Sequence, residues 1–204
     1  MPFLKKITHQ ADTTIYIWQI TETISTLKKE LRLNISSKQK YKFLQTKAHK
    51  KQFLATQQLL QLAGLNSYYL YYDKNGKPFL NNGLYISISH NNDYAVLAIS
   101  KKNIGVDIEQ KQTKLQRVAS KFIGSENKFI TTNDLVYLTK IWTAKEAIYK
   151  LKNHKGLSFK ENIHINPFLK DEMHTKGIIS IDNKEEFLKI YYFNFENSIL
   201  ALAI

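Results

Sequence analysis

The chain has no cysteine among its 204 residues, which excludes disulfide bonds, thiolate nucleophiles and zinc–thiolate sites. It also lacks any apolar run long enough to cross a membrane, and residues 1–10 lack the apolar core of a signal peptide. Hydrophobic residues make up 43% of the chain, which argues against disorder. We therefore expect a folded protein of the cytoplasm that has no membrane partner.

Arginine is scarce and lysine is abundant: Arg32 and Arg117 are the only arginines, and the formal net charge is +13. A charge of this sign favours an anionic partner, such as nucleic acid, an anionic membrane, a phosphorylated ligand or an acidic protein. Lysine suits phosphate as a point charge, whereas arginine is the usual residue that reads base edges. The charge alone does not choose among these partners.

Hydrophobic periodicity and turn residues predict both strands and helices. One helix is expected to begin near Asn34, to continue at helical spacing to Leu62 and to stop at Gly64. Two more helices are expected over residues 115–129 and 134–151. The expected strands cover residues 14–20, 68–72, 84–90, 94–100, 105–109, 163–165, 177–181, 187–195 and 198–204.

The segment 94–99 resembles 198–204 in composition, and each closes a strand pair that follows a helical region. This repetition predicts an α+β fold of two similar halves, residues 1–102 and 103–204, related by a pseudo-twofold axis. Each half is expected to be a small, mostly antiparallel sheet packed with helices. A ligand site is expected between the halves, because a cleft between packed units is a common place for a ligand.

Two carboxylates lie on one face of the predicted strand 105–109. Asp107 and Glu109 are two residues apart, so their side chains leave the same face, while isoleucine and valine occupy the other. Such carboxylates repel one another unless a cation lies between them. Because cysteine is absent, oxygen ligands and Mg²⁺ are the natural combination. A solvent-facing strand edge is the alternative interpretation.

A third carboxylate lies on the predicted helix around residues 142–150, where Glu146 is flanked by Lys145 and Lys150. One interpretation is an ordinary ion pair between Glu146 and Lys150, which are four residues apart. The other is that Glu146 completes a metal site with the two strand carboxylates. Three carboxylates with nearby ammonium groups are what a divalent cation and a phosphorylated substrate need together.

Several other polar residues are ambiguous when each is taken alone. His90, at the end of a predicted strand, is either structural or a donor to a phosphate, and Lys77 is ordinarily a solvated turn residue. Lys50 and Lys51 form either a solvated helix face or a phosphate anchor, and Glu126 is ordinarily a surface charge.

Taken together and in order, these segments resemble the 4′-phosphopantetheinyl transferases of the two-halved Sfp type. That family is marked by a G-[IV]-D-[IV]-E strand and a W-x-x-K-E-[AS]-x-x-K helix. Shorter motifs of the family surround these two, with matching spacing. The corresponding segments of this chain are 76–78 (G-K-P), 87–90 (S-I-S-H), 105–109, 122–126 (F-x-x-x-E), 142–150 and 155–157 (K-G-L).

The resemblance implies transfer of the phosphopantetheine arm of coenzyme A to a serine of an apo carrier protein, with release of 3′,5′-ADP. It implies that Asp107, Glu109 and Glu146 hold Mg²⁺, that Glu146 accepts the serine proton and that Glu126 is an accessory acid near the metal. Lys150 is then both a catalytic and a coenzyme A-binding residue. The other coenzyme A contacts implied are Lys38, Lys50, Lys51, Lys77, Pro78, Ser89, His90 and Lys155.

One helix departs from the family pattern. The family commonly carries arginines there for the 3′-phosphate of coenzyme A, whereas this chain has Lys50, Lys51 and Gln57. Either lysine can substitute as a point charge, but Gln57 cannot. The resemblance further implies an acidic acyl or peptidyl carrier protein as partner, in fatty-acid, polyketide or non-ribosomal peptide synthesis, and a monomer that does not bind nucleic acid.

Two other functions fit parts of the sequence. A Mg-dependent nuclease can be built from Asp107, Glu109 and Lys111, because Glu109 and Lys111 form an E-x-K pattern and the positive charge suits DNA. That hypothesis leaves the helix around residues 142–150, His90 and the Lys77 turn without a role. A non-catalytic binder of an acidic partner is the third hypothesis.

Overall fold

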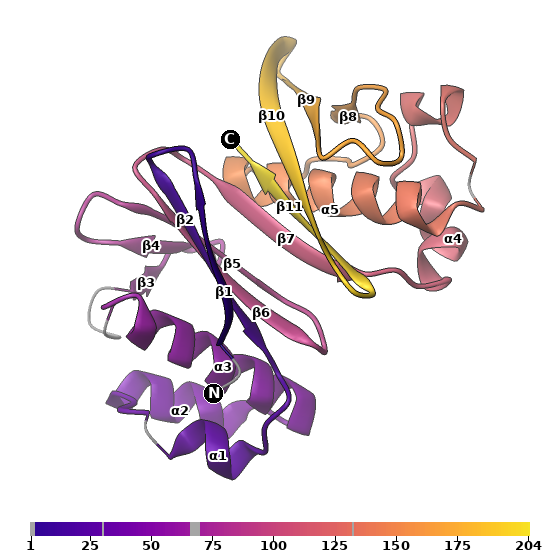
Figure 1. Ribbon diagram of the computed structural model, residues 1–204. Helices are drawn as coiled ribbons and strands as arrows, with labels where there is room; N and C mark the ends of the chain where they lie inside the picture. The colour runs from indigo at the N-terminus through magenta and orange to yellow at the C-terminus, as the bar shows by residue number, and fades with distance from the viewer. Residues whose placement is uncertain (1–2, 30, 66–69, 132) are drawn as a thin grey trace. The chain divides into compact units, whose positions relative to one another are not determined.

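The computed structural model describes the chain over residues 3–29, 31–65, 70–131 and 133–204. It divides into two compact units, residues 1–103 and 104–204, coloured indigo to magenta and pink to yellow in Figure 1. Each unit combines antiparallel sheet with helices, which confirms the α+β class. No helix in the described ranges is long and apolar enough to cross a membrane.

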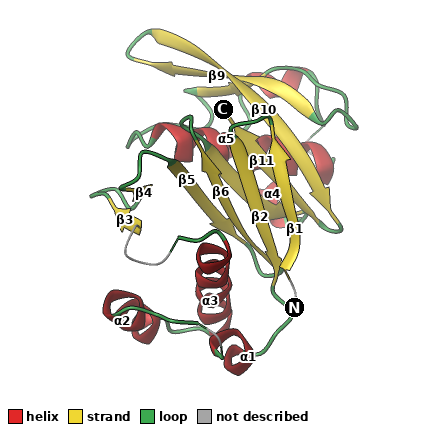
Figure 2. Cartoon of the chain, turned by 60° about the vertical axis from the view of Figure 1, so that its left-hand side comes forward, coloured by secondary structure: helices red, strands yellow, loops and turns green. Residues whose placement is uncertain are grey.

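The N-terminal unit contains a four-stranded antiparallel sheet in the order β1-β2-β6-β5 and a small β3-β4 pair. Its helix α3 packs against β6 and β2, and Figure 2 shows α1, α2 and α3 gathered together in this unit. The elements are β1 (Phe3–His9), β2 (Thr13–Gln19), α1 (Ile24–Lys28), α2 (Ile35–Phe43), α3 (Lys47–Leu62), β3 (Leu70–Tyr72), β4 (Pro78–Leu80), β5 (Tyr85–His90) and β6 (Tyr94–Ser100).

The single helix expected from Asn34 to Leu62 is in fact two helices. Asn34 caps α2 as predicted, because its side-chain oxygen accepts from the backbone N–H of Ser37 at 2.7 Å. The chain then turns extended at Leu44, and the Thr46 hydroxyl caps α3 by accepting from the His49 N–H at 3.0 Å. The continuous hydrophobic spacing therefore concealed a second N-cap.

The sequence also did not predict β1, α1 or β4, and part of the strand expected at 68–72 lies outside the described residues.

The C-terminal unit contains a five-stranded antiparallel sheet in the order β7-β11-β10-β9-β8, with the long helix α5 packed on one face. Two short 3-10 turns, η1 and η2, follow α4. The elements are β7 (Gly105–Gln110), α4 (Lys114–Val118), η1 (Ala119–Lys121), η2 (Ser125–Lys128), α5 (Leu135–Lys152), β8 (Ile163–Ile165), β9 (His174–Ile181), β10 (Lys184–Phe195) and β11 (Ser198–Ala203).

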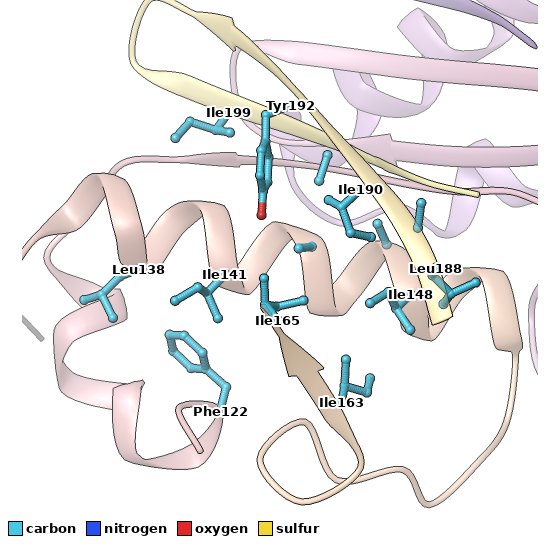
Figure 3. Packing of buried hydrophobic residues seen from close by; sticks show 14 of the residues in the cluster. Phe122, Leu138, Ile141, Ile148, Ile163, Ile165, Leu188, Ile190, Tyr192 and Ile199 are labelled. Atoms are coloured by element: carbon cyan, nitrogen blue, oxygen red, sulfur yellow. The ribbon is translucent and has the colours of Figure 1, made fainter. Parts of the chain in front are cut away.

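Aliphatic side chains join α5 to this sheet. Figure 3 shows Leu138, Ile141 and Ile148 of α5 among the strand residues Ile165 and Ile190, all at most 2% exposed. Burying an aliphatic side chain of this size contributes on the order of 2 kcal/mol. The core therefore fixes both the position and the rotation of α5 on the sheet.

The helix expected over residues 115–129 is wrong beyond Val118. After α4 the chain continues through η1 and η2, and Glu126 lies in the second of these turns. Its carboxylate accepts from the Gly124 backbone N–H at 2.9 Å and from that of Ile165 at 2.9 Å. These bonds replace the regular helical ladder with a compact loop that is bonded to β8.

Gly105 has a steric requirement that explains the first residue of the G-V-D-I-E strand. A Cβ atom at Gly105 would lie 1.9 Å from the Ala147 carbonyl oxygen and 2.8 Å from the Leu151 nitrogen. Both atoms belong to the backbone of α5, which cannot move without displacing the helix. A glycine is therefore needed for β7 and α5 to lie this close.

We predict that Gly105→Ala lowers the free energy of unfolding by about 3 kcal/mol, because overpacking against a backbone cannot relax. Gly177→Ala is the matched control, since the nearest atoms to its new Cβ all belong to side chains: Ile148 Cδ1 at 2.6 Å, and Ile165 Cδ1 and Ile190 Cγ1 at 3.6 Å. The Ile148 methyl group can rotate away, so we expect a loss of about 1 kcal/mol. Urea unfolding of both variants measures the difference, and equal losses would contradict a rigid β7–α5 contact.

Candidate active site

The carboxylates of β7 face α5, as the alternation of the strand requires. Asp107 is 4% exposed, and its Oδ1 accepts from Lys150 Nζ at 2.7 Å. The same ammonium donates to the Val106 carbonyl oxygen at 3.1 Å. Lys150 lies one turn beyond Glu146 on α5, so the strand and the helix together place a carboxylate and an ammonium in direct contact.

Glu109 lies two residues further along β7, and it is half-buried beside Trp142. The indole Nε1 of Trp142 donates to Glu109 Oε1 at 3.3 Å. Burial raises the pKa of Glu109, and the negative charge of Asp107 raises it further. The indole bond and the charge of Lys150 act in the opposite direction, so they favour the ionised carboxylate.

Glu146 is the most strongly perturbed carboxylate of the site. Burial, followed by the charges of Asp107 and Glu109, raises the pKa of Glu146 from 4.5 to about 7, against the opposing charge of Lys150. The three carboxylates predicted from the sequence therefore lie close enough to repel one another. The structure joins two motifs that are separated by more than thirty residues in the sequence.

This set of oxygen donors suits a hard divalent cation, because the mutual repulsion of the carboxylates is what such a cation removes. In the described part of the chain, no three acidic or histidine side chains converge closely enough to form a ready-made metal site. Asp107 is bonded to Lys150, which supplies part of the compensating charge. Binding of a cation by Asp107 would therefore require this carboxylate to exchange its bond to Lys150 for the cation.

The second lysine of the helix motif has a different environment. Lys145 and Glu126 form an ion pair at 2.8 Å in which both side chains are 0% exposed. Lys145 Nζ also donates to the carbonyl oxygens of Phe122 and Phe159, at 2.7 and 2.8 Å. The flanking Lys145 is therefore internal and not open to a phosphate. The Glu126 carboxylate, for which the resemblance implied an accessory role near a metal, accepts from the backbone N–H groups of Gly124 and Ile165 as well as from Lys145.

Two further lysines of this unit bear on the competing functions. Lys155 is exposed in the turn after α5, where it is accessible to a ligand. Lys111 Nζ donates to the Glu196 carbonyl oxygen at 2.8 Å, and the Lys111 backbone N–H donates to the Asn197 carbonyl oxygen at 2.8 Å. This lysine therefore anchors the β10–β11 turn, which does not favour its use as a nuclease residue.

In the N-terminal unit, Lys77 and Pro78 lie beside a pocket of about 470 Å³ that Tyr85 and Asn103 also line. The backbone N–H of Lys77 donates to Asp73 Oδ1 at 2.9 Å, so the turn chemistry is as predicted. Lys77 Nζ donates to Asn103 Oδ1 at 3.2 Å.

A second pocket, of about 190 Å³, contains His90. Ile88 and His90 line it from one face of β5, whereas the intervening Ser89 is buried and points to the other face. The helices contribute Lys40 and His49, among other residues.

The basic residues of this pocket differ from those that the sequence suggested. Among the described residues that line it are Lys40 and His49, and not Lys38, Lys50 or Lys51. Nothing in the sequence placed Lys40 and His49 beside His90, because α2 and α3 were expected to form one helix. The hidden N-cap at Thr46 was the signal that could have found them, since a break there redirects both flanking helices.

Comparison with known proteins agrees with this arrangement. Residues 103–202 match the family model of the 4′-phosphopantetheinyl transferase superfamily. The chain is also 30% identical over 148 residues to "4′-phosphopantetheinyl transferase gsp" of Aneurinibacillus migulanus. The match covers 69% of this chain and 60% of that relative's length. The chain belongs to the 4′-phosphopantetheinyl transferase superfamily.

We predict that Glu146→Gln stabilises the metal-free protein at alkaline pH. The pKa of Glu146 is about 7 in the folded state and 4.5 without its surroundings, so the folded state binds the proton more tightly. Stability contributed by the protonated carboxyl is therefore present below 4.5 and is lost as the pH rises to about 7. At about pH 8, the variant should exceed the wild type by about 2 kcal/mol, and at about pH 4 the two should agree.

Urea unfolding in EDTA across this pH range tests the prediction. Glu185→Gln removes an exposed carboxylate of β10 outside the site, and this variant should follow the wild-type profile. Parallel profiles for Glu146→Gln and wild type would show that Glu146 is not electrostatically strained.

Proposed function

We propose that this protein transfers the 4′-phosphopantetheine arm of coenzyme A to a serine of an apo carrier protein and releases 3′,5′-ADP. The observation that carries the proposal is that Asp107, Glu109 and Glu146 lie close enough for their negative charges to repel one another, beside the ammonium of Lys150. Membership of the superfamily supports it. The E-x-K nuclease is not favoured, because Lys111 serves the β10–β11 turn.

The reaction replaces a phosphoanhydride bond of coenzyme A by a phosphoester bond to the serine. The serine hydroxyl oxygen attacks the phosphorus that bears the pantetheine arm, and the bond from that phosphorus to the bridging pyrophosphate oxygen breaks. The bridging oxygen and its electron pair leave with 3′,5′-ADP, and the serine proton passes to Glu146. Glu146 comes from α5, whereas the other two carboxylates come from β7, and this separate placement makes it the candidate proton acceptor.

Charge on the leaving phosphate must be neutralised as the bond breaks. Mg²⁺, held by Asp107, Glu109 and Glu146, would supply that neutralisation when bound. Lys150 is the counter-ion of Asp107 in the ligand-free chain, and its side chain is 30% exposed, so the ammonium is open to a pyrophosphate oxygen. We assign Lys155, in the exposed turn after α5, to the pyrophosphate of coenzyme A as well.

The nucleotide end of coenzyme A is assigned to the N-terminal unit. We propose that Lys77, Pro78, Ser89 and His90 contact the nucleotide and its phosphates. For the 3′-phosphate, Lys38, Lys50 and Lys51 remain candidates from the sequence. The lining of the His90 pocket adds Lys40 and His49 to these candidates.

The carrier protein is proposed to be acidic, because the net charge of +13 would steer an acidic partner towards this chain. We propose fatty-acid, polyketide or non-ribosomal peptide carriers as the partner class, a cytoplasmic location and a monomeric enzyme that binds no nucleic acid.

We predict that incubation with coenzyme A, Mg²⁺ and an apo acyl carrier protein adds one phosphopantetheinyl group, observed as an intact-mass increase of the carrier. Asp107→Asn should lower the rate at least a hundredfold, because it removes charge from the cation site. Lys111→Ala is the control: it should retain transfer but would abolish a nuclease. Absence of any mass increase with several carrier types, by folded protein, would contradict the proposed transfer.

We predict that Lys40→Ala raises KM for coenzyme A about tenfold with little change in kcat, because it removes one charge-assisted phosphate contact. The same variant should have little effect with dephospho-coenzyme A, which lacks the 3′-phosphate. Lys51→Ala, on the neighbouring helix, is the comparison. If the selective loss follows Lys51→Ala instead, the sequence-derived candidate binds the 3′-phosphate and the pocket lining does not.

A further inference from the structure

The buried pair of Lys145 and Glu126 is fully satisfied by internal partners. An ammonium has three hydrogens, and Lys145 donates them to Glu126, the Phe122 carbonyl and the Phe159 carbonyl. Burying two charges is costly unless every partner is present. This arrangement therefore fixes the two loops that contain Phe122 and Phe159 against the middle of α5.

The rings of those two loops brace a third aromatic residue. The Trp142 ring lies 5.0 Å from that of Phe122 in an edge-to-face arrangement, and 5.4 Å from that of Phe159. Trp142 is three residues before Lys145 on α5, on the same side of the helix. The lysine holds the backbone of both phenylalanines while their side chains hold the indole.

The indole, in turn, contacts the carboxylate that belongs to the candidate metal site. Trp142 Nε1 donates to Glu109 Oε1 at 3.3 Å. A glutamate side chain has three rotatable bonds, and fixing it costs about 1–2 kcal/mol of conformational free energy. The Nε1–H donor of Trp142, whose ring is packed between Phe122 and Phe159, restricts the rotation of the Glu109 side chain before a ligand binds.

We propose that Trp142 is a positioning residue that holds the Glu109 carboxylate in place for a divalent cation, supported by the Lys145–Glu126 pair through Phe122 and Phe159. The inference rests on the proposed function, because it takes Glu109 as a metal ligand. Trp142 acts through Glu109, as outer hydrogen-bond partners of metal ligands commonly do.

Trp142→Phe separates the hydrogen bond from the packing, since phenylalanine keeps a ring between the two loops but has no N–H. The chain offers a matched control in its other tryptophan. Trp18 Nε1 donates to Glu22 Oε2, also at 3.3 Å, in the N-terminal unit. Trp18→Phe therefore removes the same donor and a similar volume away from the candidate site.

The experiment measures Mn²⁺ binding to the full chain by electron paramagnetic resonance, with Mn²⁺ as the probe for the Mg²⁺ site, together with urea unfolding of each variant. We expect Trp142→Phe to weaken Mn²⁺ binding about tenfold. Trp18→Phe should bind Mn²⁺ as the wild type does, although both variants should lose similar stability. In a Glu109→Ala background, Trp142→Phe should produce no further loss of Mn²⁺ affinity, because its only route to the cation has been removed.

Two results would overturn the inference while leaving the metal site intact. One is unchanged Mn²⁺ affinity in folded Trp142→Phe, and the other is an undiminished loss in the Glu109→Ala background. If the wild type itself binds no Mn²⁺, the cation site fails and the inference fails with it. Transfer to a carrier protein is measured separately, so failure of Trp142 as a positioning residue is distinguishable from failure of the proposed function.

Discussion

The close approach of β7 to α5 at Gly105 is the constraint on which the rest of the C-terminal unit depends. The Ala147 carbonyl lies where a side chain at position 105 would begin, so the strand and helix backbones are in contact there. Side chains further along the same face of β7 then meet α5 directly. Because β7 and α5 lie this close, Asp107 contacts Lys150 directly and Glu109 contacts Trp142 directly.

The lysines of α5 hold the surrounding loops by a common device. Lys140, which is 1% exposed, donates to the carbonyl oxygens of Lys170 and Glu172, both at 2.7 Å. Lys145 does the same for Phe122 and Phe159. Irregular segments have carbonyl groups without ladder partners, and an ammonium can satisfy several of them at once. The loops of this unit are therefore ordered by the helix that they surround.

The sequence predicted β7 and α5 well, because each has a strong local pattern: alternation in one and an Asp134 cap with helical spacing in the other. It failed at residues 119–129, where a regular helix would bond the Phe122 carbonyl to the Glu126 N–H. The Phe122 carbonyl accepts from Lys145 Nζ instead, and a local sequence pattern cannot indicate a hydrogen-bond donor twenty-three residues away. The split at Thr46 was missed for the opposite reason, since a local cap was outweighed by hydrophobic spacing.

The candidate site shows the same limit at the level of single residues. In the sequence, Lys145 and Lys150 flank Glu146 equally, and both appear suited to a phosphate. In the structure, Lys145 is 0% exposed with three internal acceptors, whereas Lys150 is 30% exposed and has the Asp107 carboxylate and the Val106 carbonyl among its partners. A buried and saturated ammonium has nothing left to offer a ligand, while a partly exposed one beside an acid can exchange partners. The difference in burial therefore indicates that Lys145 stabilises the fold around the site, whereas Lys150 is available for its chemistry.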